Sequence, residues 1–299
     1  MTHRLGSWTP PDDADTALAL RGVHARYPGA SADVLDCVSL TIGLGRRTAV
    51  LGANGSGKTT LLRVLSGAHR PAAGTVISGG RPLDHGRRGL TAHRQRVQLV
   101  TQDPDDQLFS ADVRADVGYG PTNLGLPPEE VVARVDEALD VLSLCDLADR
   151  PVHRLSFGQR KRVAVAGALA MRSDVLLLDE PTAGLDPVGV AEMLDAVAAL
   201  ERHGTTVVLS THDVDLAWRW ADEVVVVVDG VVSQGSVRDA LGDADLLARA
   251  RLEQPWPLAL LGSLGMEPAQ YGWPRTHTDV AAVLARAGVT PVAGEAGRT

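Results

Sequence analysis

The chain has 299 residues, is 44% hydrophobic and 22% charged, and carries a formal net charge of −8 with a pI near 5.6. This composition is typical of a globular protein with a sizeable core, and the acidic balance argues against a nucleic-acid partner, because affinity for a phosphate backbone needs clustered Lys and Arg. No apolar run reaches the roughly 18 to 20 residues that cross a bilayer, and the N-terminus lacks a signal-peptide pattern. We therefore expect a chain that works in the cytoplasm.

Residues 1–16 show no hydrophobic periodicity, so we expect a disordered leader there. From residue 17 to about residue 240, short apolar strands alternate with amphipathic helices, which is the pattern of a parallel sheet covered on both faces. The strands that we expect are Thr48–Leu51, Val97–Val100, Val175–Leu178, Thr206–Leu209 and Val224–Val228. The sequence therefore predicts an α/β domain over 17–240.

A long stretch without a strand pattern separates the second and third of these strands. It holds two expected helices, near Pro128–Ser143 and Phe157–Met171, and we expect a helical subdomain over about 104–170. Residues 241–299 contain Trp, Pro and one short expected helix near Val280–Ala287. We assign them to a C-terminal tail without chemistry.

A glycine-rich loop follows the first strand directly and ends in Lys58 and Thr59. Two glycines with four residues between them, followed by Lys and Ser or Thr, form the phosphate-binding loop pattern. The loop's N–H groups point at phosphate oxygens, the lysine neutralises the β- and γ-phosphates, and the Thr hydroxyl holds Mg²⁺. Because the chain has only two lysines, a chance match is improbable. The nucleotide-binding residues that we expect here are Gly52, Ala53, Asn54, Gly55, Ser56, Gly57, Lys58, Thr59 and Thr60.

Two adjacent carboxylates, Asp179 and Glu180, end the apolar strand that begins at Val175. In open α/β sheets this is the edge where ligands bind. The first acid suits Mg²⁺ coordination through water, and the second can orient and polarise an attacking water, because phosphoryl transfer needs a positioned nucleophile. An apolar strand followed by Asp-Glu is common by itself, but beside the phosphate-binding loop it indicates a P-loop NTPase.

A third motif, Leu155-Ser156-Phe157-Gly158-Gln159, opens a helix about 20 residues before Asp179. Here the chain resembles the ABC ATPase family, whose signature at this position is LSGGQ. The order of phosphate loop, glutamine, signature, acid pair, Gly184-Leu185-Asp186 and histidine is also similar, over roughly residues 18–240. The resemblance implies a RecA-like P-loop NTPase core with a parallel sheet, an antiparallel β arm and a helical signature subdomain, which hydrolyses ATP with Mg²⁺.

The same resemblance implies roles for single residues outside the phosphate loop. Tyr27 would stack on adenine, and His212 would contact the γ-phosphate. Gln102 would touch Mg²⁺ and sense a membrane partner. The implied Mg²⁺ ligands are therefore Thr59, Gln102 and Asp179, with Gln102 and His212 acting beside the catalytic glutamate.

The signature implies a dimer, because in this family the signature serine and its helix N-terminus cap the γ-phosphate of the nucleotide held by the opposite subunit. In this chain the implied residues are Ser156, Gly158 and Gln159, with Asp186 nearby. Phe157 stands where the commonest pattern has glycine, which puts the closeness of the cap in doubt, although Gly158 still allows close backbone approach. A homodimer and a heterodimer with a sister ATPase both stay open.

The LSFGQ variant, with the segments 103–109 and 210–216, looks like the energy-coupling-factor ATPases, and most like their cobalt- and nickel-uptake type. This implies membrane-spanning transporter subunits as partners and a peripheral place on the cytoplasmic face of the cell membrane. Vitamin-uptake relatives carry similar segments, so that substrate class stays open. A soluble ABC ATPase acting on DNA or ribosomes is a further alternative, but the expected long coiled coil or duplicated cassette is not found in the sequence.

The remaining residues with metal or redox chemistry form no motif. The nine histidines have no spacing of a ligand set, His85 and His93 being the nearest approach, and we expect surface histidines. Cys37 and Cys145 are expected to be buried free thiols.

Overall fold

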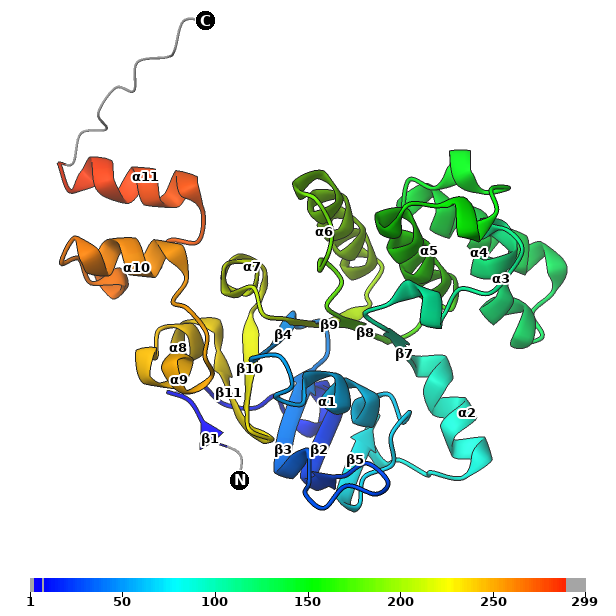
Figure 1. The fold of residues 1–299 in the computed structure, drawn as a ribbon, viewed down its shortest axis with the longest axis horizontal. Helices are drawn as coiled ribbons and strands as arrows, with labels where there is room; N and C mark the ends of the chain where they lie inside the picture. Colours follow the sequence, from blue (N-terminus) through cyan, green and yellow to red (C-terminus); the bar gives the residue numbers. More distant parts are fainter. Residues whose placement is uncertain (1–2, 7, 289–299) are drawn as a thin grey trace, which may run out of the picture.

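A seven-stranded sheet forms the centre of the protein in the computed structural model, which describes residues 3–6 and 8–288 (Figure 1). Its strands in spatial order are β1 (His3–Arg4), β11 (Val231–Ser236), β10 (Glu223–Val228), β4 (Thr48–Leu51), β9 (Thr206–Thr211), β8 (Val175–Asp179) and β7 (Val97–Val100). Neighbours from β10 to β7 run parallel, and β11 is antiparallel to β10. All five predicted strands are confirmed, three of them longer by one or two residues.

A second, antiparallel sheet packs against one face of the first and confirms the predicted β arm. Its strands in spatial order are β3 (Leu35–Gly43), β2 (Thr16–Ala25), β5 (Ala73–Ser78) and β6 (Arg81–Pro82). Because successive side chains of a strand point to opposite faces, the central strands serve two cores at once. In β8, Leu176 and Leu178 enter the core under the helices, while Val175 and Leu177 enter the core shared with the antiparallel sheet. This double burial explains the unbroken apolar strands.

Helices cover the sheet and form a separate group at one end (Figure 1). The helices that follow the central strands are α1 (Lys58–Leu65), α2 (Arg87–Arg96), α6 (Pro187–Arg202) and α7 (Val214–Trp220). The group at one end consists of α3 (Val113–Asn123), α4 (Pro128–Val141) and α5 (Phe157–Ala170), which pack on one another. Two of these three were predicted. The missed helix, α3, contains two glycines and Pro121, and its weak amphipathicity left no periodic pattern.

The expected disordered leader is wrong for residues 3–6 and 8–16. Strand β1 pairs in parallel with β11, and the N–H of Leu5 donates to the carbonyl of Gln234 at 3.0 Å. A short 3-10 turn at Asp13–Asp15 then leads into β2. The exposed edge of β11 supplies backbone partners that a reading of local periodicity cannot anticipate. The rest of the expected leader, residues 1–2 and 7, lies outside the described residues.

The described part of the C-terminal tail packs on the central domain. Its helices are α8 (Val237–Leu241), α9 (Ala244–Arg249), α10 (Trp256–Ser263) and α11 (His277–Arg286). The Trp218 ring lies 6.1 Å from Trp273, and its Nε1 donates to the carbonyl of Pro274 at 2.9 Å. The helix expected near Val280–Ala287 is therefore present as α11 and starts earlier, while residues 289–299 lie outside the described part. The tail buries apolar side chains in the main core, so its described part, up to residue 288, is packed as part of the domain.

Two smaller expectations are corrected. Cys37 and Cys145 are both exposed. His93 is buried, and its ring nitrogens meet Ser78 Oγ and the Leu65 carbonyl, so it is not a surface histidine. Among the described helices, none combines the length and the apolarity needed to cross a membrane.

Candidate nucleotide-binding site

The glycine-rich loop lies between the end of β4 and the start of α1, as the motif predicts. Two of its glycines are required by geometry. A Cβ on Gly52 would lie 2.5 Å from the carbonyl oxygen of Val227, and Gly57 caps α1 with a φ of 112°. Gly55 faces open space, so a Cβ there would meet nothing within 4 Å. The loop is thus tightly folded on its inner side and open on the side where phosphates would bind.

Lys58 is only 6% exposed and turns back over the loop. Its Nζ donates to the carbonyl of Gly52 at 2.8 Å and lies 3.3 Å from Glu180 Oε1. The Ser56 hydroxyl is buried without a hydrogen-bond partner. A buried hydroxyl normally has a partner, so this oxygen fits a loop whose polar groups are completed by phosphate oxygens.

A pocket of about 300 Å³ brings together residues that the sequence places far apart. Its lining consists of Asn54, Gly55, Lys58, Thr59, Gln102, Glu180, Ala183 and His212. Gln102, Glu180 and His212 each follow the carboxyl end of a parallel strand, which is why β7, β8 and β9 deliver them to one edge. Six of these residues have polar side chains of the kinds that phosphates and a hard cation need.

Glu180 is held at this edge by several contacts. Its carboxylate lies between Lys58 and His212, whose Nδ1 is 3.1 Å from Glu180 Oε2. Its backbone adopts φ 47°, an uncommon region for a residue with a Cβ, which the surrounding contacts must maintain. Its N–H donates to Ser210 Oγ at 2.9 Å, and Ser210 donates in turn to Asp179 Oδ1 at 2.6 Å. The carboxylate pair is therefore fixed from β9.

Outside the 52–59 loop, three predicted residues lie close to the phosphate pocket without lining it. Asp179 is 3% exposed and precedes Glu180, which does line the pocket, so it suits a contact with Mg²⁺ through water. Thr60 is buried in α1. Tyr27 places its hydroxyl 3.1 Å from Thr60 Oγ1 and its ring 4.9 Å from that of His69. The adenine-stacking role of Tyr27 stays a prediction.

The signature motif forms a second pocket, of about 390 Å³, at the start of α5. Ser156 caps this helix in a reciprocal pair: its Oγ accepts from the Gln159 N–H at 3.2 Å, and Gln159 Oε1 accepts from the Ser156 N–H at 2.9 Å. Gly158 and Asp186 line the same pocket, and Asp186 caps α6. No residue lines both this pocket and the phosphate pocket. One chain thus does not bring the two motifs together.

Phe157, which stands where the common signature has glycine, does not cover the start of α5. Its ring packs against Gly184, where an added Cβ would lie 3.2 Å from the ring. Phe157 is 38% exposed, and Gly158 beside it is half-buried. The phenylalanine thus lies against the loop after Glu180.

Sequence reasoning missed Lys161, which lies in α5 and is 3% exposed. Its Nζ donates to the carbonyls of Glu180 at 2.7 Å, Ala183 at 2.8 Å and Pro181 at 3.3 Å. Burial lowers the pKa of Lys161 to about 8, against the opposing effect of the carboxylates of Glu180 and Asp179. The only sequence feature that could have found it is that the chain contains just one lysine besides Lys58.

The fold and the first pocket define a P-loop NTPase, and the capped signature helix places it among the ATP-binding cassettes. Residues 35–183 match the family model described as ABC transporter. The cobalt import ATP-binding protein CbiO of Rhodobacter capsulatus is 47% identical over 90% of this chain and 97% of its own length. The energy-coupling factor transporter ATP-binding protein EcfA of Methanocaldococcus jannaschii is 40% identical over 85% and 92%.

The solved structures agree with this result. The structure of cbiO1 from Clostridium perfringens, part of the transporter complex cbiONQ, has a TM-score of 0.72 and 38% identity, and the match covers 84% of this chain and 99% of that one. The chain belongs to the ATP-binding subunits of ABC transporters and is most like the energy-coupling-factor ATPases. It is therefore an ATP-hydrolysing transport ATPase.

Proposed function

We propose that this chain energises the import of cobalt or nickel ions through membrane-spanning partner subunits, from a peripheral place on the cytoplasmic face of the membrane. The observation that carries the substrate class is the 47% identity, over nearly the full length of both chains, to a protein named for cobalt import. Relatives that are named only for the energy-coupling factor fit vitamin uptake as well. Vitamins are therefore the second candidate.

The catalytic unit is a dimer in this proposal. The signature pocket contains a helix N-terminus and the Ser156 hydroxyl, which together suit a phosphate group. Because no lining residue is shared with the phosphate pocket of the same chain, the signature is available to a second copy or to a sister ATPase. ATP bound between Lys58 of one subunit and Ser156 of the other would hold the two subunits together.

The chemistry follows from the two partners of Glu180. Lys58 can turn from Glu180 and Gly52 toward β- and γ-phosphate oxygens, and the freed carboxylate can then orient and polarise the attacking water. His212, next to Glu180 Oε2, is placed to donate to a γ-phosphate oxygen. Mg²⁺ would be held by Thr59, Gln102 and, through water, Asp179, and would neutralise charge that develops on the phosphates.

A surface for the membrane partner lies beside Gln102. Phe109 and Tyr119 are 65% and 51% exposed, and their rings meet edge to face with centroids 4.6 Å apart. Exposed aromatic pairs of this kind are enriched at protein interfaces. Because Gln102 and Phe109 belong to one short segment after β7, a partner that binds this aromatic pair could act on the phosphate pocket directly.

The test is the uptake of labelled cobalt and nickel by cells that express this chain with the membrane-protein genes beside it. The control is Lys58→Ala, which leaves the subunit surface intact and removes the phosphate contact. We expect cells with the wild-type chain to take up the labelled metal and cells with Lys58→Ala not to. Metal uptake absent from both, with ATP hydrolysis by the purified wild-type chain intact, would overturn the substrate assignment and leave the ATPase assignment standing.

A further inference from the structure

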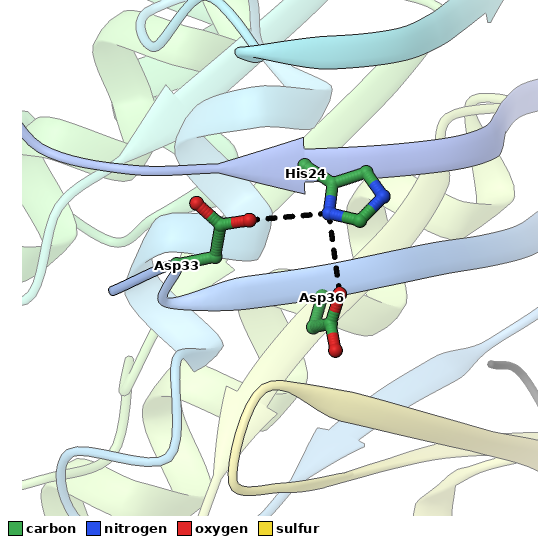
Figure 2. A group of neighbouring side chains, drawn as sticks. All are labelled: His24, Asp33 and Asp36. Atoms are coloured by element: carbon green, nitrogen blue, oxygen red, sulfur yellow. Dashed lines mark hydrogen bonds and ion pairs between the residues drawn. The ribbon is translucent and has the colours of Figure 1, made fainter. Parts of the chain in front are cut away.

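Three potential metal ligands meet on the hairpin of β2 and β3, outside the nucleotide site. His24 lies in β2, Asp36 in β3, and Asp33 in the connection between them (Figure 2). His24 Nδ1 is 3.1 Å from Asp33 Oδ2 and 3.2 Å from Asp36 Oδ1, and one ligand atom from each residue lies within 4.8 Å of the others. The expectation from histidine spacing missed this group, because two of its three members are aspartates.

The separations match those across a metal ion. Ligand atoms roughly 2.1 Å from a metal lie roughly 3.0 Å apart at an octahedral angle and roughly 3.4 Å apart at a tetrahedral one. The two observed N–O separations fall inside this range. A three-centre hydrogen bond from one imidazole N–H to both carboxylates gives similar lengths, so the metal titration described below distinguishes the two arrangements. A dication between the three atoms satisfies all of them.

The charges and the exposure also suit a cation. Arg26 Nε donates to Asp33 Oδ1 at 2.8 Å, which orients this carboxylate and leaves Oδ2 directed at His24. The two carboxylates supply the negatively charged oxygen ligands that a cation needs. The side chains of His24, Asp33 and Asp36 are 31%, 22% and 63% exposed, so water can reach the site and complete a coordination shell.

We propose that His24, Asp33 and Asp36 form a site for a divalent transition metal ion such as Co²⁺, Ni²⁺ or Zn²⁺. An imidazole in the set favours these ions over Mg²⁺ and Ca²⁺, which prefer oxygen ligands throughout. The site is independent of the substrate proposed above, since it lies on the antiparallel sheet of the ATPase itself.

A metal at this site would tie together the two ends of the segment that carries Tyr27. His24 precedes this segment and Asp33 ends it. The Val34 N–H already closes this segment by donating to the Ala25 carbonyl at 2.7 Å, and a metal would add side-chain bonds to the closure. Any effect of the metal on nucleotide affinity would be reciprocal. This coupling rests on the predicted adenine contact of Tyr27, whereas metal binding itself does not.

The test titrates Co²⁺ into the full, nucleotide-free chain with excess Mg²⁺ present, followed by visible absorption and by calorimetry. We expect one Co²⁺ per chain, and binding at least tenfold weaker in His24→Gln and Asp36→Asn. His153→Ala, an exposed histidine on another element, is the matched control and should bind as the wild type does. Thermal unfolding without metal shows that the variants are folded. Equal binding by wild type and His24→Gln, or no binding by either, would overturn the site.

A separate observation concerns the two lysines of the chain. Among 29 basic Lys and Arg residues only Lys58 and Lys161 are lysines, both are buried, and both meet Glu180, one at its carboxylate and one at its carbonyl. The three carbonyls around Lys161 Nζ match the three N–H groups of an ammonium. A planar guanidinium directs its donors as a flat fork and cannot reproduce this arrangement.

The neighbour of Lys161 in α5 makes a second connection. Arg160 Nε lies 2.8 Å from Asp105 Oδ1, three residues after Gln102. Consecutive residues of the signature helix therefore hold the segment after β7 and the turn that carries Glu180. We infer that Lys161 is a positioning residue, which keeps the catalytic carboxylate in register with α5 and with the segment that receives the membrane partner.

The test compares Lys161→Arg and Lys161→Gln by steady-state ATP hydrolysis, nucleotide affinity and thermal unfolding. Because a displacement of about 1 Å can cost up to about a hundredfold in rate, we expect kcat to fall roughly tenfold or more in both variants, with the dissociation constant for ATP unchanged. Arg172→Lys, just after the end of α5 and 55% exposed, is the control. A normal kcat in Lys161→Arg would contradict the three-donor argument. A parallel loss of affinity and folding would show that Lys161 has a general structural role only.

Discussion

The phosphate pocket and the signature pocket differ in how complete each is within one chain. In the phosphate pocket, Lys58 and His212 both contact the Glu180 carboxylate. At the signature, the side chains of Ser156 and Gln159 each bond to the backbone N–H of the other, and the helix N-terminus faces a pocket that no phosphate-loop residue lines. The phosphate pocket is thus preassembled within one chain, whereas the signature lies apart from it. If the chain pairs as proposed, each subunit prepares its own catalytic groups and receives the signature from the other.

The largest effect is expected at the preassembled pocket. Glu180→Gln keeps the size and the backbone contacts of the side chain but removes its negative charge, so water is no longer polarised. We expect ATP turnover to fall about a hundredfold or more while nucleotide affinity is retained. Glu129→Gln, an exposed acid in α4, is the matched control. Unchanged turnover in Glu180→Gln would mean that the catalytic carboxylate lies elsewhere.

The second prediction sharpens the contrast between the two pockets. Gly158→Asp places a carboxylate at the start of α5, where a negative charge favours the helix but repels a phosphate. An added Cβ there meets only Leu185 Cδ2, at 3.2 Å, so folding should persist. We expect Gly158→Asp and Lys58→Ala to be inactive alone, with nucleotide affinity kept in the former.

Mixing these two variants decides where the signature acts. In a mixed dimer, one site combines the intact loop of one chain with the intact signature of the other. Random pairing makes half of the dimers mixed, with half of their sites intact, so turnover should return to about a quarter of the wild-type value. If the mixture of Gly158→Asp and Lys58→Ala stays inactive after the subunits have exchanged, the signature acts on the nucleotide of its own chain.

A smaller effect is expected from Lys161, which connects the signature helix α5 to the turn that carries Glu180. The pKa of Lys161 is lowered to about 8 by burial, which the charges of Glu180, Asp179 and Asp103 oppose. Above about pH 8 the folded chain has released this proton while the unfolded chain still binds it, up to the ordinary pKa near 10.5. The contribution of Lys161 to stability therefore rises with pH between these values. The measurement is the denaturant midpoint of wild type and of Lys161→Met at several pH values from 7 to 10. Above pH 8 the wild-type midpoint should rise with pH relative to that of Lys161→Met. The same pH dependence in both proteins would contradict the prediction.

The same comparison shows what the sequence could predict. The strands and the phosphate loop depend on local patterns, since Val175–Leu178 is apolar throughout and Lys58 follows the glycines of its loop at a fixed spacing. The meeting of Gln102 and Glu180 was also predictable, because the carboxyl ends of parallel strands share an edge. What local patterns could not give are contacts that the assembled fold creates. Examples are β1 on the edge of β11 and the three carbonyls around Lys161.

The smallest effect is expected at Tyr27, at the margin of the preassembled pocket. Its ring packs near His69, and its hydroxyl meets Thr60, which is buried in α1. If the ring stacks on adenine, Tyr27→Ala should weaken ATP binding by about 1–3 kcal/mol, the usual value for loss of base stacking on an aromatic ring, and leave kcat unchanged. Tyr27→Phe keeps the ring, removes the Thr60 contact, and should bind ATP as the wild type does. Equal weakening in both variants would assign the effect to the hydroxyl, and Tyr27 would then support α1 rather than the base.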